Sequence, residues 1–364
     1  MSLNVSVPEV PSIRELKAAI PAQCFQPSIW KSISYFLFDI CLIAGLFALA
    51  LYLDSWYFYP VYWFLQGTMF WALFVVGHDC GHGSFSHSKR LNSFIGHLAH
   101  TPILVPYHGW RISHRTHHQN TGNIEKDETW YPVTESQYRN MPRYIKFLRF
   151  YAFLVLFPLY LFRRSPGKDG SHFHPASDLF LPSEKWDVLT SSLSWFAFFG
   201  LLCAASWWFG IAAVAKFYIA PYFVFVVWLD LVTFLHHTSE DIPWYRGEGW
   251  NFVRGNLSSV DRSYGIFEWL HHNIGTHAVH HLFIAIPHYR LKEAAAALKP
   301  VLGPLYRTSN ESILKAFWNA FRKCHFVPDH GTMVYYKPSS ALSHEEKLGA
   351  LDAAKALTRA LETE

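Results

Sequence analysis

Residues 61–82 read VYWFLQGTMFWALFVVGHDCGH, so that seventeen uncharged residues run directly into two histidines four positions apart, His78 and His82. Upstream, residues 32–53 form a 22-residue apolar run with one acid, Asp39. About 20 apolar residues in a helix span the ~30 Å hydrocarbon core of a bilayer, and the aromatic turn at residues 54–60 is typical of a membrane interface. The two runs predict a helical hairpin that delivers both histidines to the membrane surface.

A second hairpin is predicted between residues 188 and 235, where the apolar sequence is broken around residues 207–210. The four spans are then expected at about 32–53, 61–77, 188–209 and 211–235. If both hairpins return to one side, thirty of the 31 Lys and Arg residues lie on that side and only Lys216 lies on the other. The positive-inside rule makes the basic side cytoplasmic. We therefore expect a multi-pass integral membrane protein with both termini in the cytoplasm.

The remaining segments are expected to stay on the cytoplasmic side. Two shorter apolar stretches, residues 94–107 and 147–162, are read as interfacial, because a crossing at the second would place histidine-rich segments on opposite sides of the membrane. Residues 341–364 alternate charges with Ala and Leu and predict a solvated helix. The expected organisation is a cytoplasmic N-terminal segment (1–31), a membrane domain (32–298) and a cytoplasmic C-terminal region (299–364).

Composition excludes an ordinary water-soluble domain. Only 16 % of the residues are charged, against about 25 % in soluble proteins. The five cysteines are scattered, which predicts neither a disulfide framework nor a thiolate metal site and favours a reducing compartment. The net charge of +4 is modest, and no nucleic-acid partner is expected.

Histidine is the residue type that most needs an explanation, because eight of the 22 histidines form three clusters. The clusters are HxxxH at His78 and His82, HxxHH at His114, His117 and His118, and HxxHH at His277, His280 and His281. Residues three and four apart share a helix face, so each cluster can direct imidazoles at one point. Eight imidazoles exceed the ligands of a single zinc ion, and imidazole also suits iron, copper and nickel. The count predicts a pair of metal ions.

Ligand histidines need acceptors for their second ring nitrogen. The acids close to the clusters in sequence are Asp79, Glu125, Asp127, Glu128 and Glu268. Ten further histidines show no such spacing and are expected to have no part in a metal site: His87, His97, His100, His108, His172, His174, His288, His325, His330 and His344.

The clusters and their flanks resemble the three histidine boxes of membrane fatty-acid desaturases; they are HDCGHGSF from His78, HRTHHQN from His114, and HNIGTH from His272 onward to His288 and Tyr289. The stretches SHFHPASDLF from Ser171 and PWYRG from Pro243 resemble the omega-3 branch of cyanobacteria and plastids. The resemblance covers roughly residues 63–298. It implies an all-α integral membrane fold in which four transmembrane helices form two hairpins and a cytoplasmic helical cap holds a histidine-ligated di-iron site.

The resemblance also implies the ligands, which are the eight box histidines and one histidine at the end of the fourth span. His237 matches that position, with His236 as the alternative. Some relatives carry an asparagine one turn earlier that helps to hold a metal-bound water, whereas this chain has Thr233. Asp79, Asp127 and Glu268 are the candidates to orient ligands. No catalytic residue beyond the ligands is expected.

The implied reaction is the oxygen-dependent omega-3 desaturation of acyl chains in membrane glycerolipids, from linoleoyl to alpha-linolenoyl. Two iron ions and O2 are the implied cofactor and co-substrate, and separate reduced ferredoxin is the implied electron donor. The position of the new double bond depends on the geometry of an apolar tunnel. Trp71, Phe74, Trp228 and Phe234 are candidates to line it or to face lipid. Arg111, Arg115, Arg246 and Arg254 are candidates to contact lipid headgroups or an acidic donor protein.

Three alternatives remain open at this point. An omega-6 (delta-12) desaturase or a di-iron hydroxylase shares the same histidine spacing. A histidine-rich membrane metal transporter would carry ionisable residues along its spans, and here the spans contain only Asp39 and Asp230 as acids. A membrane anchor without chemistry would require the three histidine spacings to be coincidental.

Overall fold

The structure, a computed structural model, describes residues 7–151, 153–164 and 170–342. Its helices are α1 (Ile13–Ala19), α2 (Ile29–Leu53), α3 (Tyr59–His82), α4 (Lys89–His100), α5 (Tyr107–Asn120), α6 (Glu135–Asn140), α7 (Arg143–Tyr151), α8 (Phe157–Phe162), α9 (Lys185–Phe209), α10 (Ile211–Val214), α11 (Ala220–His237), α12 (Phe252–Asn256), α13 (His277–Leu282), α14 (Leu291–Leu302) and α15 (Ile313–Lys323). Two short strand pairs accompany them. β1 (Trp244–Tyr245) lies antiparallel to β4 (Met333–Val334), and β2 (Asp261–Arg262) lies parallel to β3 (Thr308–Ser309).

Four helical segments of the described chain are long and apolar enough to cross a membrane: Ile29–Leu53, Tyr59–His82, Pro182–Phe209 and Ile211–His237. Each contains one of the four expected spans. The last is one continuous helical segment because a π-helical turn at Ala215–Ile219 joins α10 to α11. The chain is therefore a mostly helical membrane protein.

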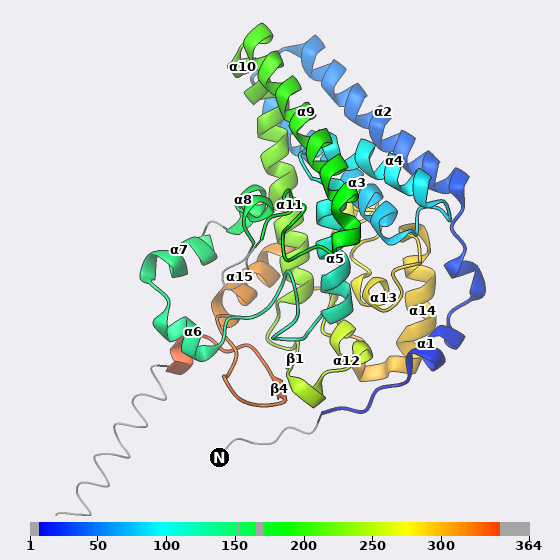
Figure 1. Cartoon of the computed structure of the whole chain (residues 1–364), viewed down its shortest axis with the longest axis vertical. Coiled ribbons are helices and arrows are strands. Elements are labelled where there is room, and N and C mark those ends of the chain that lie inside the picture. The colour runs from blue at the N-terminus through cyan, green and yellow to red at the C-terminus, as the bar shows by residue number, and fades with distance from the viewer. Residues whose placement is uncertain (1–6, 152, 165–169, 343–364) are drawn as a thin grey trace, which may run out of the picture.

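The spanning helices differ in how deeply they are buried. Nearly all side chains of α3 from Gln66 to Cys80 are buried, whereas α2 and α9 expose large apolar side chains such as Leu37, Leu51, Phe196 and Leu201. Figure 1 shows α2, α9, α10 and α11 extending toward one end of the molecule, while α1, α12, α13, α14 and the β1–β4 pair gather at the other. Exposed apolar side chains of this extent on long helices are expected where lipid is the solvent.

Helices α3 and α11 form the centre of the membrane part. A Cβ on Gly67 would lie 2.5 Å from both the Pro221 carbonyl oxygen and the Val224 Cβ, so only glycine permits this approach. Around them a hydrophobic core joins side chains of α3, α5, α8, α9 and α11, among them Trp71, Phe157 and Phe225. A second core joins α1, α12, α13 and α14.

The end of α3 positions the first histidine pair. Gly83 adopts φ 75°, a left-handed conformation that favours glycine. Its N–H donates to the carbonyl oxygens of Asp79 and Cys80. The helix therefore ends at His82, and the chain turns away at Gly83.

The two short apolar stretches do not form long helices. Residues 94–107 belong to the end of α4, a 3-10 turn and the start of α5, and residues 147–162 are divided into α7, a 3-10 turn and α8. Within the described residues, neither stretch contains a helix long enough to span a bilayer. The expected helix at residues 341–364 lies, from residue 343 onward, outside the described residues.

Candidate metal centre

Five of the nine predicted histidines form a first group: His78 and His82 from α3, His114 and His118 from α5, and His280 from α13. One ring nitrogen of each lies within 4.8 Å of the others. The Nε2 atoms of His78 and His82 are 3.2 Å apart, those of His114 and His118 are 3.0 Å apart, and those of His118 and His280 are 3.1 Å apart. Segments up to 202 positions apart in the chain (280 minus 78) therefore meet at one point.

The other four histidines form a second group. His117, His237 and His281 come together from α5, α11 and α13. His277 joins them, because its Nε2 lies 3.0 Å from that of His237 and 2.9 Å from that of His281. The structure thus divides the nine predicted residues into a group of five and a group of four.

The HxxHH spacing explains how α5 and α13 serve both groups. His114 and His118 lie one turn apart on one face of α5, and His277 and His281 do the same on α13. The remaining histidine of each motif, His117 or His280, points to the opposite group. Two short helices can therefore hold a pair of adjacent sites.

The chemistry of both groups fits metal ions. Burial lowers the pKa of five histidines outside the spans well below its usual value, and repulsion among neighbouring imidazoles lowers it further. These rings therefore stay neutral and keep a lone pair free for a metal ion. The five are His114, His118, His277, His280 and His281. Nitrogens bound to one ion at about 2.1 Å lie about 3 Å from their neighbours, which matches the observed Nε2 spacings. Imidazole is a good ligand for iron.

Acidic side chains lie behind two of these histidines. His117 Nδ1 donates to Asp127 Oδ1 at 2.7 Å, and Asp127 also accepts the backbone N–H groups of Thr129 and Trp130. His78 Nδ1 lies 3.5 Å from Asp79 Oδ1. The hydrogen bond to Asp127 fixes the tautomer and the direction of the His117 ring. The contact of Asp79 with His78 is longer than a hydrogen bond, and His78 Nδ1 has no hydrogen-bond partner among the described residues.

The other nearby acids have different partners. The carboxylate of Glu268 accepts the Tyr264 N–H and faces Lys292 at 3.9 Å. Glu128 pairs with Arg164, and Glu125 with Arg246 at 3.7 Å.

Several supporting residues carry no signal in the sequence. His281 Nδ1 lies 3.0 Å from Thr121 Oγ1 and 3.3 Å from Asn256 Oδ1. Asp261 Oδ1 accepts the backbone N–H groups of His277 and Ala278, at 2.8 and 2.9 Å, at the start of α13. No local spacing links these residues to the histidine clusters, so a search for motifs would not find them.

The two adjacent histidines at the end of α11 have different surroundings. His237 Nε2 points into the second group. His236 makes hydrogen bonds with both ring nitrogens, since Nδ1 donates to the Val260 carbonyl oxygen at 2.7 Å and Nε2 lies 3.1 Å from the Tyr264 hydroxyl. Of the two, only His237 has a ring nitrogen directed at the group.

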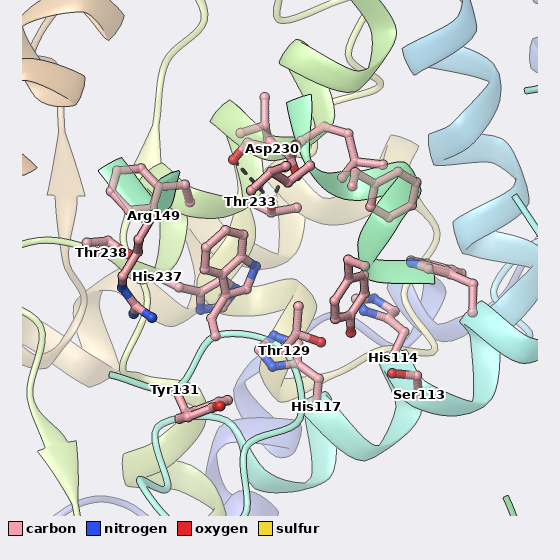
Figure 2. A pocket seen from close by; sticks show the side chains of 18 of the residues that line it. Ser113, His114, His117, Thr129, Tyr131, Arg149, Asp230, Thr233, His237 and Thr238 are labelled. Atoms are coloured by element: carbon pink, nitrogen blue, oxygen red, sulfur yellow. Dashed lines mark hydrogen bonds between the residues drawn. The ribbon is translucent and has the colours of Figure 1, made fainter. Parts of the chain in front are cut away.

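A cavity of about 420 Å³ adjoins both groups. His78 and His114 of the first group and His117, His237 and His277 of the second line it. Figure 2 shows His114, His117 and His237 around this space, with Thr233 and Asp230 from the preceding turns of α11. The hydroxyl of Thr233 donates to the carbonyl oxygen of Leu229, at 2.7 Å, within its own helix.

The rest of the cavity wall is largely apolar. Trp71, Phe74 and Phe234, which the sequence left open as tunnel-lining or lipid-facing, line it together with Phe157 and Leu229. Trp228 does not line this cavity. Its indole N–H donates to Thr68 Oγ1 at 3.0 Å, and its ring packs against His271.

The four arginines that were candidates to contact lipid headgroups or an acidic donor protein all have partners within the chain. Arg111 pairs with Asp187 at 3.1 Å and Arg115 with Glu184 at 2.8 Å. Arg246 faces Glu125 and donates to the Pro328 carbonyl oxygen, and Arg254 donates to the carbonyl oxygens of Pro8 and Gly249. These contacts tie segments of the polar region together.

Comparison with known proteins gives consistent results. The sequence model of the family described as "Fatty acid desaturase" matches residues 54–312. The chain is 60% identical over 336 residues to the sn-1 acyl-lipid omega-3 desaturase (ferredoxin) of Synechocystis sp., covering 92% of this chain and 94% of that protein. It is 61% identical over 325 residues to the protein of the same name from Nostoc sp., covering 89% and 90%. A temperature-sensitive sn-2 acyl-lipid omega-3 desaturase (ferredoxin) of Arabidopsis thaliana chloroplasts is 51% identical over 342 residues, covering 91% and 79%.

Proposed function

The chain belongs to the fatty acid desaturase family, and from that premise we propose that it is an omega-3 desaturase of lipid-bound acyl chains. It converts linoleoyl to alpha-linolenoyl groups in membrane glycerolipids and takes its electrons from reduced ferredoxin. The observation that carries this proposal is the identity of 60% or more, over about nine tenths of the chain, with proteins named for that activity.

The metal centre is proposed to hold two iron ions, one in each histidine group. The first iron is assigned to His78, His82, His114, His118 and His280, and the second to His117, His237, His277 and His281. When bound, the iron pair supplies the activation of O2 that removal of two hydrogens from an unactivated methylene pair requires. With one O2, two electrons and two protons, desaturation yields two molecules of water.

In this reaction the protein binds the metal ions, orients the ligand rings and excludes water from the reacting carbons. The imidazoles bind the ions, while Asp127 fixes the direction of His117 and Asp79 lies 3.5 Å behind His78. The apolar wall of the cavity keeps water from the reacting carbons and sets which methylene pair lies beside the histidine groups, where an error of about 1 Å is costly. We assign the choice of the omega-3 position to the shape of this wall.

The arrangement in the membrane is proposed to be two hairpins, α2–α3 and α9–α11, with both termini and the metal centre in the cytoplasm. Asp54, in the turn after α2, pairs with Lys216, in the turn before α11, at 3.1 Å. This contact supports a common far end for the two hairpins, opposite the end where His82 and His237 lie. The sided distribution of Lys and Arg supports the orientation.

The test is expression of the protein in a host that contains reduced ferredoxin, with oleoyl or linoleoyl lipids supplied separately. Gas chromatography with mass spectrometry is expected to show a new double bond in linoleoyl chains. Purified protein is expected to contain two irons per chain, and His280→Ala is expected to abolish the product while the protein still inserts. Desaturation of oleoyl chains with no change in linoleoyl chains would contradict the omega-3 assignment.

A further inference from the structure

Helix α2 buries few side chains, and one of them is an acid. Its buried residues are Ser32, Phe36, Asp39 and Ala50, and Asp39 is fully buried. A carboxyl group within an apolar span is costly and is usually kept for a function. The metal groups described above contain no residue of α2.

The partner of Asp39 comes from a distant loop. His272 Nε2 donates to Asp39 Oδ2 at 2.7 Å, and both side chains are almost completely buried. One turn before Asp39 on the same helix, the ring of Tyr35 packs edge-on against His272. A side chain of the first span is thus bonded directly to the segment that precedes α13.

The contact continues from His272 to the first metal group. The ring of His272 packs against that of His288 with centroids 4.7 Å apart, and Tyr35 packs edge-on against His288 as well. His288 donates to Asp79 Oδ2 from both Nδ1, at 2.9 Å, and its backbone N–H, at 3.0 Å. The other oxygen of Asp79 faces His78. A buried row of side chains therefore leads from Asp39 to a proposed ligand.

The backbone at His272 needs support. His272 and Asn273 have φ values of 50° and 57°, two consecutive left-handed residues without a glycine. Such conformations are unfavourable and persist where the surroundings fix them. The Asp39 contact holds the first residue, and the Glu268 carbonyl oxygen accepts the N–H of the second. Four residues after Asn273 the chain reaches His277, so the loop sets where α13 begins.

We propose that Asp39 is a positioning residue of the metal centre, acting from within the first span. Through His272 and His288 it holds Asp79 in place, and Asp79 in turn lies against the ring of His78. Through the same hydrogen bond it fixes the loop that leads to His277. This inference rests on the proposed function, because it assigns a role toward the metal ions.

The experiment compares three variants of the full chain in detergent or lipid nanodiscs. Asp39→Leu removes the hydrogen bond and suits an apolar span, whereas Asp39→Asn keeps the shape and an acceptor oxygen. Asp54→Asn is the matched control, because it removes an acid from the opposite end of the same helix, where Asp54 pairs with Lys216. The measurements are iron per chain, Co2+ affinity of the metal-free protein from its absorption bands, and the thermal midpoint.

Asp39→Leu is expected to insert and fold with a lower thermal midpoint, because buried His272 loses its partner, while its Co2+ dissociation constant rises about 10–100-fold and its iron content falls. Asp39→Asn is expected to lie between it and the parent, and Asp54→Asn is expected to match the parent. Parental Co2+ affinity in Asp39→Leu would overturn the inference. If that variant does not accumulate, parental affinity in Asp39→Asn would overturn it equally. A parent protein that binds no iron would overturn the proposed function itself, and this inference with it.

Discussion

Asp127 is the best-defined support of a single ligand. It is fully buried, and it accepts a hydrogen bond from His117 at 2.7 Å in addition to two backbone N–H groups. Asp127→Asn keeps the shape and one acceptor oxygen but removes the negative charge that fixes the imidazole tautomer. We expect metal affinity and desaturation rate to fall about 10–100-fold, measured as iron per chain and as product formed per minute.

Glu135→Gln is the matched control for this change. Glu135 pairs with Arg139 one turn away on α6 and belongs to neither histidine group. It is expected to behave as the parent. If Asp127→Asn retained full iron content and full rate, the role assigned to Asp127 would be wrong.

His236 and His237 allow a sharper test, since they are neighbours in the chain with different surroundings. His237→Asn removes a ring nitrogen from the second group and is expected to lose iron and all product. His236→Gln keeps a side chain able to bond the Val260 carbonyl oxygen and the Tyr264 hydroxyl, and is expected to keep iron and at least about a tenth of the rate. Iron analysis of both purified variants shows which of the two histidines is a ligand. Loss of iron in His236→Gln but not in His237→Asn would make His236 the ligand instead.

At the scale of elements, the spacing of the histidines predicted which residues share a helix face, and the structure brings all nine together. The spacing did not predict how they divide, because the groups depend on how α3, α5, α11 and α13 are oriented in space. The hydrogen bond between Asp39 and His272 could not be predicted from sequence spacing either, because the two residues lie 233 positions apart. His288 was expected to have no part in the site, yet it contacts Asp79.

Helix α15 carries a further prediction at this scale. Its Ala316 and Ala320 are buried and share a hydrophobic cluster with Leu235 at the end of α11, while Leu314 and Trp318, one turn apart, are 82% and 54% exposed. Exposed apolar residues on one face and basic residues at the end are typical of helices that lie in the membrane interface. α15 is therefore expected to rest on the bilayer beside the end of the fourth span.

The measurement is the accessibility of a spin label in liposomes. A label at Leu314→Cys is expected to be relaxed more strongly by dissolved O2, which concentrates in lipid, than by a water-soluble nickel complex. A label at Lys315→Cys, the adjacent residue, serves as the control and is expected to give the opposite ranking. Equal exposure of both labels to the nickel complex would show that α15 stands in water.

At the scale of the whole molecule, the asymmetry of charge predicts which side of the membrane the histidine groups face, and this orientation stays a prediction. The four spanning helices and their turns follow from runs of apolar sequence, whereas the packing of α3 against α11 depends on Gly67, whose importance appears only when the two helices are seen together. All nine histidines must lie on one side of the bilayer if they are to share two ions. The proposed metal centre is therefore possible only with the proposed topology.

Cysteine labelling of vesicles of known orientation tests that topology. Suitable exposed positions are His87, after α3, and Glu240, after α11, together with Tyr57, in the turn between α2 and α3. A membrane-impermeant maleimide added to the cytoplasmic face is expected to label His87→Cys and Glu240→Cys but not Tyr57→Cys, and addition to the opposite face is expected to reverse the pattern. The parent protein is the control for its own cysteines, of which Cys41 and Cys203 are exposed on spanning helices. If His87→Cys and Glu240→Cys reacted from opposite faces, the ends of α3 and α11 would be separated by the bilayer. His78 and His237 could not then belong to one metal centre, because a shared site requires their imidazoles to lie within a few ångströms of the same pair of ions.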